Sequence, residues 1–219
     1  MKTEEYIKNS WYKTIKDVTT KGHGDIKLIK PYSVPSIGDF FCDFYYWDTF
    51  FINIGLIEDG LTDQAINNLD NIDYLIKMFG FMPNASHLLN HSQPPLYSFM
   101  IMYLYDILKD KELIGKYINS AVIEYNFYQN ERMTEIGLNQ YNAFVKDEIL
   151  DDTYDYASNR LGVYFDDINL RRKLTKCLFA ICESGWDTSP RWLSKENPFM
   201  ILDLSEIDLN SLLYGVELN

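Results

Sequence analysis

The chain reads Glu-Ser-Gly-Trp-Asp-Thr-Ser-Pro-Arg-Trp from Glu183 to Trp192. An apolar stripe at helical spacing precedes this stretch, and it consists of Leu170, Leu174, Cys177, Leu178 and Ile181. The spacing predicts an amphipathic helix that ends where the stretch begins. Gly185 has no Cβ, so a hydroxyl group of a ligand could approach its backbone closely. Asp187, taken alone, would be an ordinary capping aspartate in a loop.

Further apolar stripes predict helices at Glu4–Thr19, Tyr45–Ile57, Leu61–Phe79, Pro94–Leu108, Leu113–Phe127 and Ser205–Val216. Together with the first stripe they give about seven helices. Thr62 is a candidate cap for the helix that starts beside it, and Gly80 is a candidate stop for the same helix.

The stretches between these helices are polar, aromatic or contain Pro and Gly, and we predict them to be non-helical: Gly22–Asp43, Gly80–Gln93, Asn139–Tyr164 and Glu183–Pro198. Only Ile26–Ile29 resembles a short strand. Paired helices joined by long loops predict one all-α domain over residues 1–219, a helical toroid with its site at the loop end. An ordinary helical bundle fits the same pattern.

Composition limits the ligands and the compartment. The 219 residues suit a single domain, and 47% of them are hydrophobic, which favours a folded core. A net charge of −12 repels phosphate groups and anionic lipids, so nucleic acid and membrane surfaces are poor partners and a small neutral ligand suits the chain better. The chain begins with a polar stretch, and no segment is long and apolar enough to span a membrane. Cys42, Cys177 and Cys182 have no metal-site spacing, and the whole pattern predicts a cytoplasmic protein with reduced thiols.

His87 and His91 lie four residues apart, a spacing that can hold a metal ion on a helix. However, no third ligand follows at a recognised spacing, and Pro94 interrupts any helix that would carry both. We therefore expect neither a metal nor an organic cofactor.

Three segments together carry a resemblance. They are Tyr45-Tyr46-Trp47-Asp48, Gly80-Phe81-Met82-Pro83-Asn84 followed by Ser92-Gln93-Pro94-Pro95, and the stretch Glu183–Trp192. In this order and at these separations they resemble the trehalase family of glycoside hydrolases, over roughly Phe41 to Asn210. The resemblance implies an (α/α)6 toroid, of which this chain is the amino-terminal half, and hydrolysis of an α-glucosidic bond with inversion.

The resemblance also implies roles for particular residues. Asp187 would be the general acid, which needs a raised pKa, and Trp186 and Trp192 could desolvate it. Trp47 would pack on the glucose ring and Asp48 would accept its hydroxyl hydrogen bonds. The remaining candidates for sugar contact are Asn71, His91, Ser92, Gln93, Arg160 and Gly185.

Two further points concern individual residues. Without the later segments, Trp47-Asp48 would be a core aromatic beside a capping aspartate. Arg191 is a candidate for orienting the Glu183 carboxylate by a paired hydrogen bond.

Two departures from the family pattern concern specificity. The family has Gly-Gly-Arg-Phe-Arg-Glu before the first segment, whereas Phe40 and Cys42 stand here at the arginine positions. The family's Arg-Pro-Glu segment is not recognisable, and Arg160 is the nearest candidate for its arginine. Each arginine would supply charge-assisted hydrogen bonds of about 1.5–3 kcal/mol. The expected substrate is therefore trehalose or a related glucoside.

The catalytic base of the family is a glutamate from the carboxyl-terminal half of the toroid, beyond the match to this chain. We therefore expect activity only when a second chain or copy completes the barrel. The rival hypothesis is a non-catalytic half-barrel that binds a sugar or a partner, or the product of a truncated gene. A helical toroid of the cyclase type is a third possibility, but its Asp-rich metal motifs do not occur in the sequence.

Overall fold

The computed structural model describes residues 2–19, 24, 26–38, 40–187, 189–192, 194 and 197–219. Thr188 of the Glu183–Trp192 stretch and Asp39 of the altered arginine segment lie outside the described residues.

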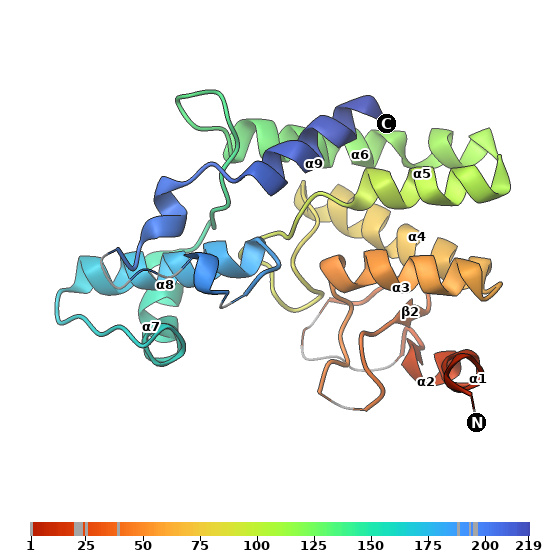
Figure 1. Ribbon diagram of the computed structural model, residues 1–219, viewed down its shortest axis with the longest axis horizontal. Helices are drawn as coiled ribbons and strands as arrows, with labels where there is room; N and C mark the ends of the chain where they lie inside the picture. The colour runs from red at the N-terminus through yellow and green to blue at the C-terminus, as the bar shows by residue number, and fades with distance from the viewer. Residues whose placement is uncertain are drawn as a thin grey trace.

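The chain is predominantly helical (Figure 1). Its first part contains α1 (Thr3–Lys8), α2 (Trp11–Thr14), β1 (Ile15–Lys16), β2 (Tyr32–Ser33), α3 (Tyr46–Glu58) and α4 (Thr62–Phe79). The middle contains α5 (Tyr97–Leu108), α6 (Lys111–Glu131), α7 (Asp147–Leu161) and α8 (Ile168–Glu183). Two short 3₁₀ helices, η1 (Pro190–Trp192) and η2 (Met200–Asp203), lead to α9 (Ile207–Leu218).

Several predicted elements differ from those observed. The single helix predicted over Glu4–Thr19 is two short helices followed by β1, which pairs antiparallel with β2 through Ile15 opposite Ser33. The strand predicted at Ile26–Ile29 was wrong, because the pairing falls later in the segment. Gly80 stops α4 with a φ of +80°, as predicted, whereas the side chain of Thr62 makes no cap and Leu61 is the N-cap residue.

Helix α7 lies inside Asn139–Tyr164, which was wrongly predicted to be non-helical. Its buried side chains are few: Leu150, Tyr154, Ala157 and Ser158. Its exposed surface is acidic, and Arg172 of α8 forms ion pairs with the exposed Asp147 and Asp151. So few buried residues give only a weak helical pattern in the sequence. The helix is stabilised mainly by its packing against α8.

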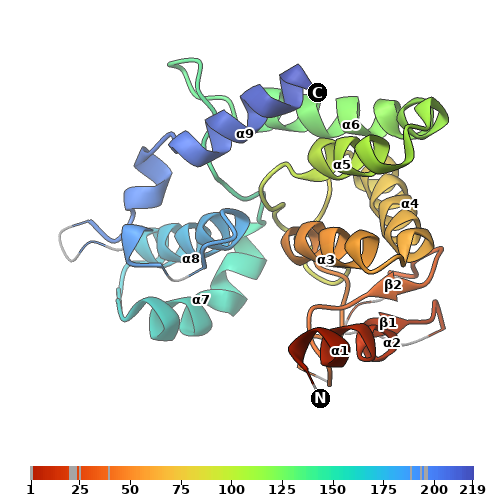
Figure 2. The ribbon, with the colours of Figure 1, turned by 45° about the vertical axis from the view of Figure 1, so that its right-hand side comes forward.

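Helices pack as neighbouring pairs, α3 with α4, α5 with α6 and α7 with α8. Figure 2 shows these pairs in an open arc, with α9 beside α6 and the end of α8 near the start of α3. This arrangement is all-α and of the toroid type.

The core has two main parts. Side chains of α3 to α6 form the first, including Leu56, Leu69 and Leu104, and side chains of α6, α8 and α9 form the second, including Ile181 and Leu213. Helix α6 contributes to both parts. Helix α6 therefore joins the two parts of the core.

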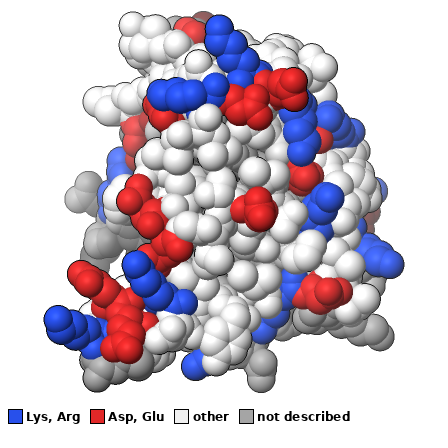
Figure 3. All heavy atoms as spheres, turned by 90° about the vertical axis from the view of Figure 1, so that its right-hand side faces the viewer, with Lys and Arg blue, Asp and Glu red and all other residues white. Residues whose placement is uncertain are grey.

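Figure 3 shows Lys and Arg interspersed with Asp and Glu on the face to the right of Figure 1. The net charge of −12 is thus not concentrated in one acidic patch on this face. Within the described part of the chain, no helix is long and apolar enough to cross a membrane.

Candidate active site

The candidate site forms where the end of α8 meets the first turn of α3 (Figures 1 and 2). After α8 the chain turns through Gly185, whose φ is +74°. A Cβ added at Gly185 would lie 2.8 Å from Cε3 of Trp47, so the indole rests directly on the glycine backbone. The Trp47 ring centroid also lies 6.4 Å from that of Trp186 and 5.5 Å from that of Phe51. Trp47 thus packs on this turn, and it is in contact with Trp186 on one side and with Phe51 of its own helix.

Asp187 follows the turn with a φ of +44°, a left-handed conformation that is uncommon for a residue other than glycine. Its side chain is 61% exposed. Partial desolvation raises the pKa of Asp187, and the nearby Arg160 opposes this shift. The carboxyl therefore holds its proton more tightly than a free aspartate does.

Asp48 is the second acid at the site, one residue after Trp47 in α3 and half-buried. Desolvation is the largest cause that raises its pKa, its own backbone N–H opposes the shift, and the charge of Asp187 adds to it. The structure therefore brings Asp48 and Asp187 into electrostatic contact, although they are far apart in the sequence.

Arg160 reaches the site from α7. Its Nη2 lies 4.0 Å from Oδ2 of Asp187, and its Nη1 donates to the hydroxyl of Tyr156 at 3.3 Å. Both charged groups are partly exposed, so this ion pair contributes little to stability. Its effect is to lower the pKa of Asp187, against the shift that desolvation causes.

A buried ion pair between Arg132 and Glu183 lies next to the candidate site. Nε and Nη2 of Arg132 donate to Glu183 at 2.8 and 2.7 Å, and both side chains are fully buried. The same carboxylate accepts the backbone N–H groups of Ser92 at 3.0 Å and Asn142 at 2.7 Å. One carboxylate thus joins α6, α8 and two loops immediately before the Gly185 turn.

Arg191 does not orient Glu183, contrary to the sequence hypothesis, because Arg132 occupies that carboxylate. Arg191 instead forms an ion pair with Asp208 at 3.0 Å, and its guanidinium lies over the rings of Trp186 and Trp192. Trp192 is 1% exposed and packs in the second core, whereas Trp186 is 49% exposed beside Trp47.

Ser92 and Gln93 are buried and hold the backbone around the site. The Ser92 hydroxyl donates to the Met82 carbonyl at 2.6 Å. Oε1 of Gln93 accepts the backbone N–H of Trp47 at 2.7 Å, which fixes the first turn of α3. Through Glu183 and Gln93, the Ser92-Gln93 pair links the Gly185 turn to Trp47.

His91 packs against α8, with its ring centroid 5.5 Å from that of Phe179. Burial lowers the pKa of His91 to about 4, so the imidazole is neutral at physiological pH. Both ring nitrogens are buried without a hydrogen-bond partner among the described residues. His87 was the other member of the possible metal pair with His91. Its Nδ1 lies 3.4 Å from Oδ2 of Asp43.

Asn71 lies apart from this cluster. Its Oδ1 accepts the backbone N–H groups of Ile29 and Lys30 at 3.0 Å, and its Nδ2 donates to the Lys30 carbonyl. Its amide therefore ties the amino-terminal loop to α4, in contrast to the predicted sugar contact.

Sequence reasoning missed several residues that build the site. Arg132 has no motif around it that indicates its partner. Asn84 belongs to the second quoted segment, and its Nδ2 lies 3.5 Å from the Cys182 carbonyl at the end of α8. Tyr46 donates to the buried Glu124 at 2.6 Å and accepts the N–H groups that begin α5, so it anchors the residue next to Trp47.

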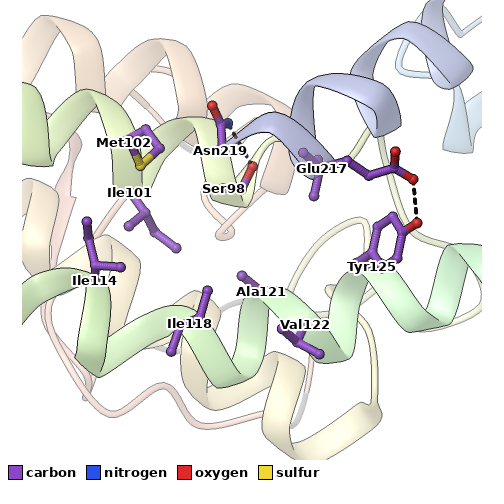
Figure 4. A pocket seen from close by; sticks show the side chains of 11 residues that line it. Ser98, Ile101, Met102, Ile114, Ile118, Ala121, Val122, Tyr125, Glu217 and Asn219 are labelled. Atoms are coloured by element: carbon purple, nitrogen blue, oxygen red, sulfur yellow. Dashed lines mark hydrogen bonds between the residues drawn. The ribbon is translucent and has the colours of Figure 1, made fainter.

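A separate apolar pocket of about 250 Å³ lies between α5, α6 and the end of α9. Figure 4 shows Ile101, Ile114, Ile118 and Val122 lining it, with Glu217 accepting a hydrogen bond from Tyr125 at its edge. Its one carboxylate is therefore already engaged, and the lining offers no pair of acids for hydrolysis.

The fold is a helical domain of the toroid type, and its candidate site is acidic and aromatic. Comparison with known proteins gives the family. A family model described as Trehalase matches residues 2–219. The chain belongs to the trehalase family.

The relatives that the chain matches are longer than the chain. It is 31% identical to a trehalase of Tenebrio molitor over 73% of this chain and 30% of the relative. It is 28% identical to a periplasmic trehalase of Xanthomonas campestris over 97% of this chain and 40% of the relative. The structure of the neutral trehalase Nth1 from Saccharomyces cerevisiae matches 99% of this chain and 45% of that chain, with a TM-score of 0.64 and 24% identity, which shows the shared fold. The chain thus spans less than half the length of these proteins.

Proposed function

We propose that this chain supplies the general acid and one glucosyl subsite of an inverting α-glucoside hydrolase. The observation that carries this proposal is the contact of Trp47 with Gly185, which sets a partly buried indole against the turn that leads to Asp187. An indole face suits the C–H surface of a sugar, and Asp48 offers oxygens to its hydroxyls.

In this proposal Asp187 gives its proton to the glycosidic oxygen while the bond between that oxygen and the anomeric carbon breaks. Water attacks the same carbon from the opposite face, and its proton passes to a second carboxylate. The raised pKa of Asp187 favours the protonated form that this step requires. The rate should therefore fall as the pH rises through that pKa.

We further propose that a second polypeptide completes the site and brings the base, since inversion needs carboxyl groups about 6.5–9.5 Å apart. The apolar pocket between α5, α6 and α9 is a surface that such a polypeptide would cover.

The test is to co-express the chain with a polypeptide equivalent to the remainder of a trehalase and to measure hydrolysis of α-glucosides. We expect Asp187→Asn to lower kcat by about 10²- to 10⁴-fold, the usual contribution of a general acid. Sugar affinity should stay unchanged. A complex that cleaves substrate equally well with asparagine at this position would contradict the proposal.

A second candidate is a partner-binding protein without turnover, which the apolar pocket favours by itself. Calorimetry separates the two, because binding of a sugar or partner without any hydrolysis by the completed complex would support this candidate.

We also place the protein in the cytoplasm. None of its three cysteines forms a disulfide, and burial raises the pKa values of Cys177 and Cys182 to about 12, so these thiols are unreactive. Some relatives are periplasmic. Fractionation of cells that express the tagged chain tests this location.

A further inference from the structure

Two exposed phenylalanines lie just before α3. Phe40 is 82% exposed and Phe41 is 44% exposed. Their ring centroids are 4.7 Å apart at an interplanar angle of 89°, and the Phe41 ring lies 5.8 Å from that of Tyr45 at 78°. The three residues form a continuous series of edge-to-face contacts, here called the aromatic row. Large apolar side chains seldom remain this exposed together without a ligand or a partner.

The aromatic row leads directly to the candidate site. Tyr45 is the N-cap residue of α3, whose first turn carries Trp47 and Asp48. Tyr45 and Asp48 are three residues apart at the start of this helix, a spacing that puts two side chains on the same face. A sugar held at Trp47 and Asp48 would therefore direct a substituent toward the row.

The row offers few hydrogen bonds to such a substituent. Phenylalanine has no donor or acceptor, and Tyr45 adds a single hydroxyl. Asp43, which follows Phe41 by two residues, is 1% exposed, and its carboxylate lies 3.4 Å from Nδ1 of His87. Hydroxyl groups that point at the two phenylalanine rings would lose water without gaining a hydrogen bond, which is unfavourable. An aromatic ring placed there would extend the edge-to-face series.

We propose that the aromatic row is the subsite for the leaving group of the substrate, and that this group is an aromatic ring. The preferred substrate class is thus an aryl α-glucoside. This inference rests on the proposed function, because the row is a leaving-group subsite only if the sugar occupies Trp47 and Asp48.

Calorimetric titration of the chain with methyl α-glucoside, phenyl α-glucoside and trehalose tests the inference without requiring turnover. We expect phenyl α-glucoside to bind about three- to tenfold more tightly than methyl α-glucoside, as one added aromatic contact allows. Trehalose should bind no more tightly than methyl α-glucoside. Phe40→Ala and the double variant Phe40→Ala/Phe41→Ala should lose the phenyl preference and keep the affinity for methyl α-glucoside.

Tyr214→Ala is the matched control, because Tyr214 is 62% exposed on α9, away from the row, and its loss should leave all three affinities unchanged. Equal affinity for the two glucosides, a phenyl preference that survives in the double variant, or tighter binding of trehalose overturns the inference while the sugar site stands. If methyl α-glucoside does not bind at all, the proposed function fails, and the inference fails with it.

Discussion

Gly185 and Trp47 are in direct contact, with the indole resting where a side chain at position 185 would lie. The contact joins the turn after α8, which carries Asp187, to the first turn of α3, which carries Asp48. Two acids from distant parts of the sequence are brought to one place because a glycine lets an aromatic ring approach the backbone.

Gly185→Ala should displace Trp47, because the new Cβ would lie 2.8 Å from the ring. We expect a loss of affinity for methyl α-glucoside of about tenfold, equivalent to about 1.4 kcal/mol of ring contact. Gly60→Ala is the control, since Gly60 has a similar φ of +80° but nothing within 4 Å of its added Cβ. Both variants should show the left-handed backbone cost of about 1–2 kcal/mol in urea unfolding, and only the first should alter sugar affinity. Equal affinities in the two variants would contradict this role of Gly185.

Arg132→Met should leave the Glu183 carboxylate buried without its cation. We expect the free energy of unfolding to fall by about 3–5 kcal/mol. Arg172→Met, which removes the ion pairs with Asp147 and Asp151 on the surface, should cost at most about 1 kcal/mol. Urea denaturation of the two variants checks the difference, and similar losses would show that the buried pair does not hold the two parts of the core together.

Glu206 should make stability depend on pH. Desolvation is the main cause that raises its pKa to about 7, from an ordinary 4.5, and the backbone N–H groups of Glu206 and Tyr141 oppose this shift. The folded state therefore binds the proton more tightly than the unfolded state, and stability declines as the pH rises from about 4.5 to about 7. Glu206→Gln should remove this decline and should be more stable than the natural chain at pH 8. Parallel stability profiles from pH 4 to 8 would contradict the prediction.

Local patterns in the sequence predicted much of the helical framework. The stripes at Leu61–Phe79 and Leu170–Ile181 correspond to α4 and α8, because each helix buries a broad apolar face. The end of α4 at Gly80 could be predicted because glycine readily adopts the left-handed backbone conformation that ends a helix. Helix α7 was missed since only a few of its side chains are buried against α8.

The candidate site was harder to predict where partners lie far apart in sequence. Trp47, Gly185 and Asp187 came from quoted segments, and the structure brings them together. Nothing local to Glu183 indicates that Arg132, rather than Arg191, is its partner, since the pairing depends on how α6 packs on α8. For the same reason the amide of Asn71 could not be assigned to the backbone of the amino-terminal loop.

The central claim is that Asp187 is an acid whose proton affinity is raised at a sugar site, and ¹³C NMR titration of its carboxyl group tests this most directly. The Asp187→Asn variant assigns the resonance. We predict a pKa above the ordinary value of 3.8, a further rise in Arg160→Met, which lacks the opposing cation, and no change in Arg172→Met. Saturation of the natural chain with methyl α-glucoside should also raise the pKa of Asp187, because the sugar would displace water from its carboxyl group. A pKa at or below 3.8 that neither Arg160→Met nor the sugar changes would contradict the account.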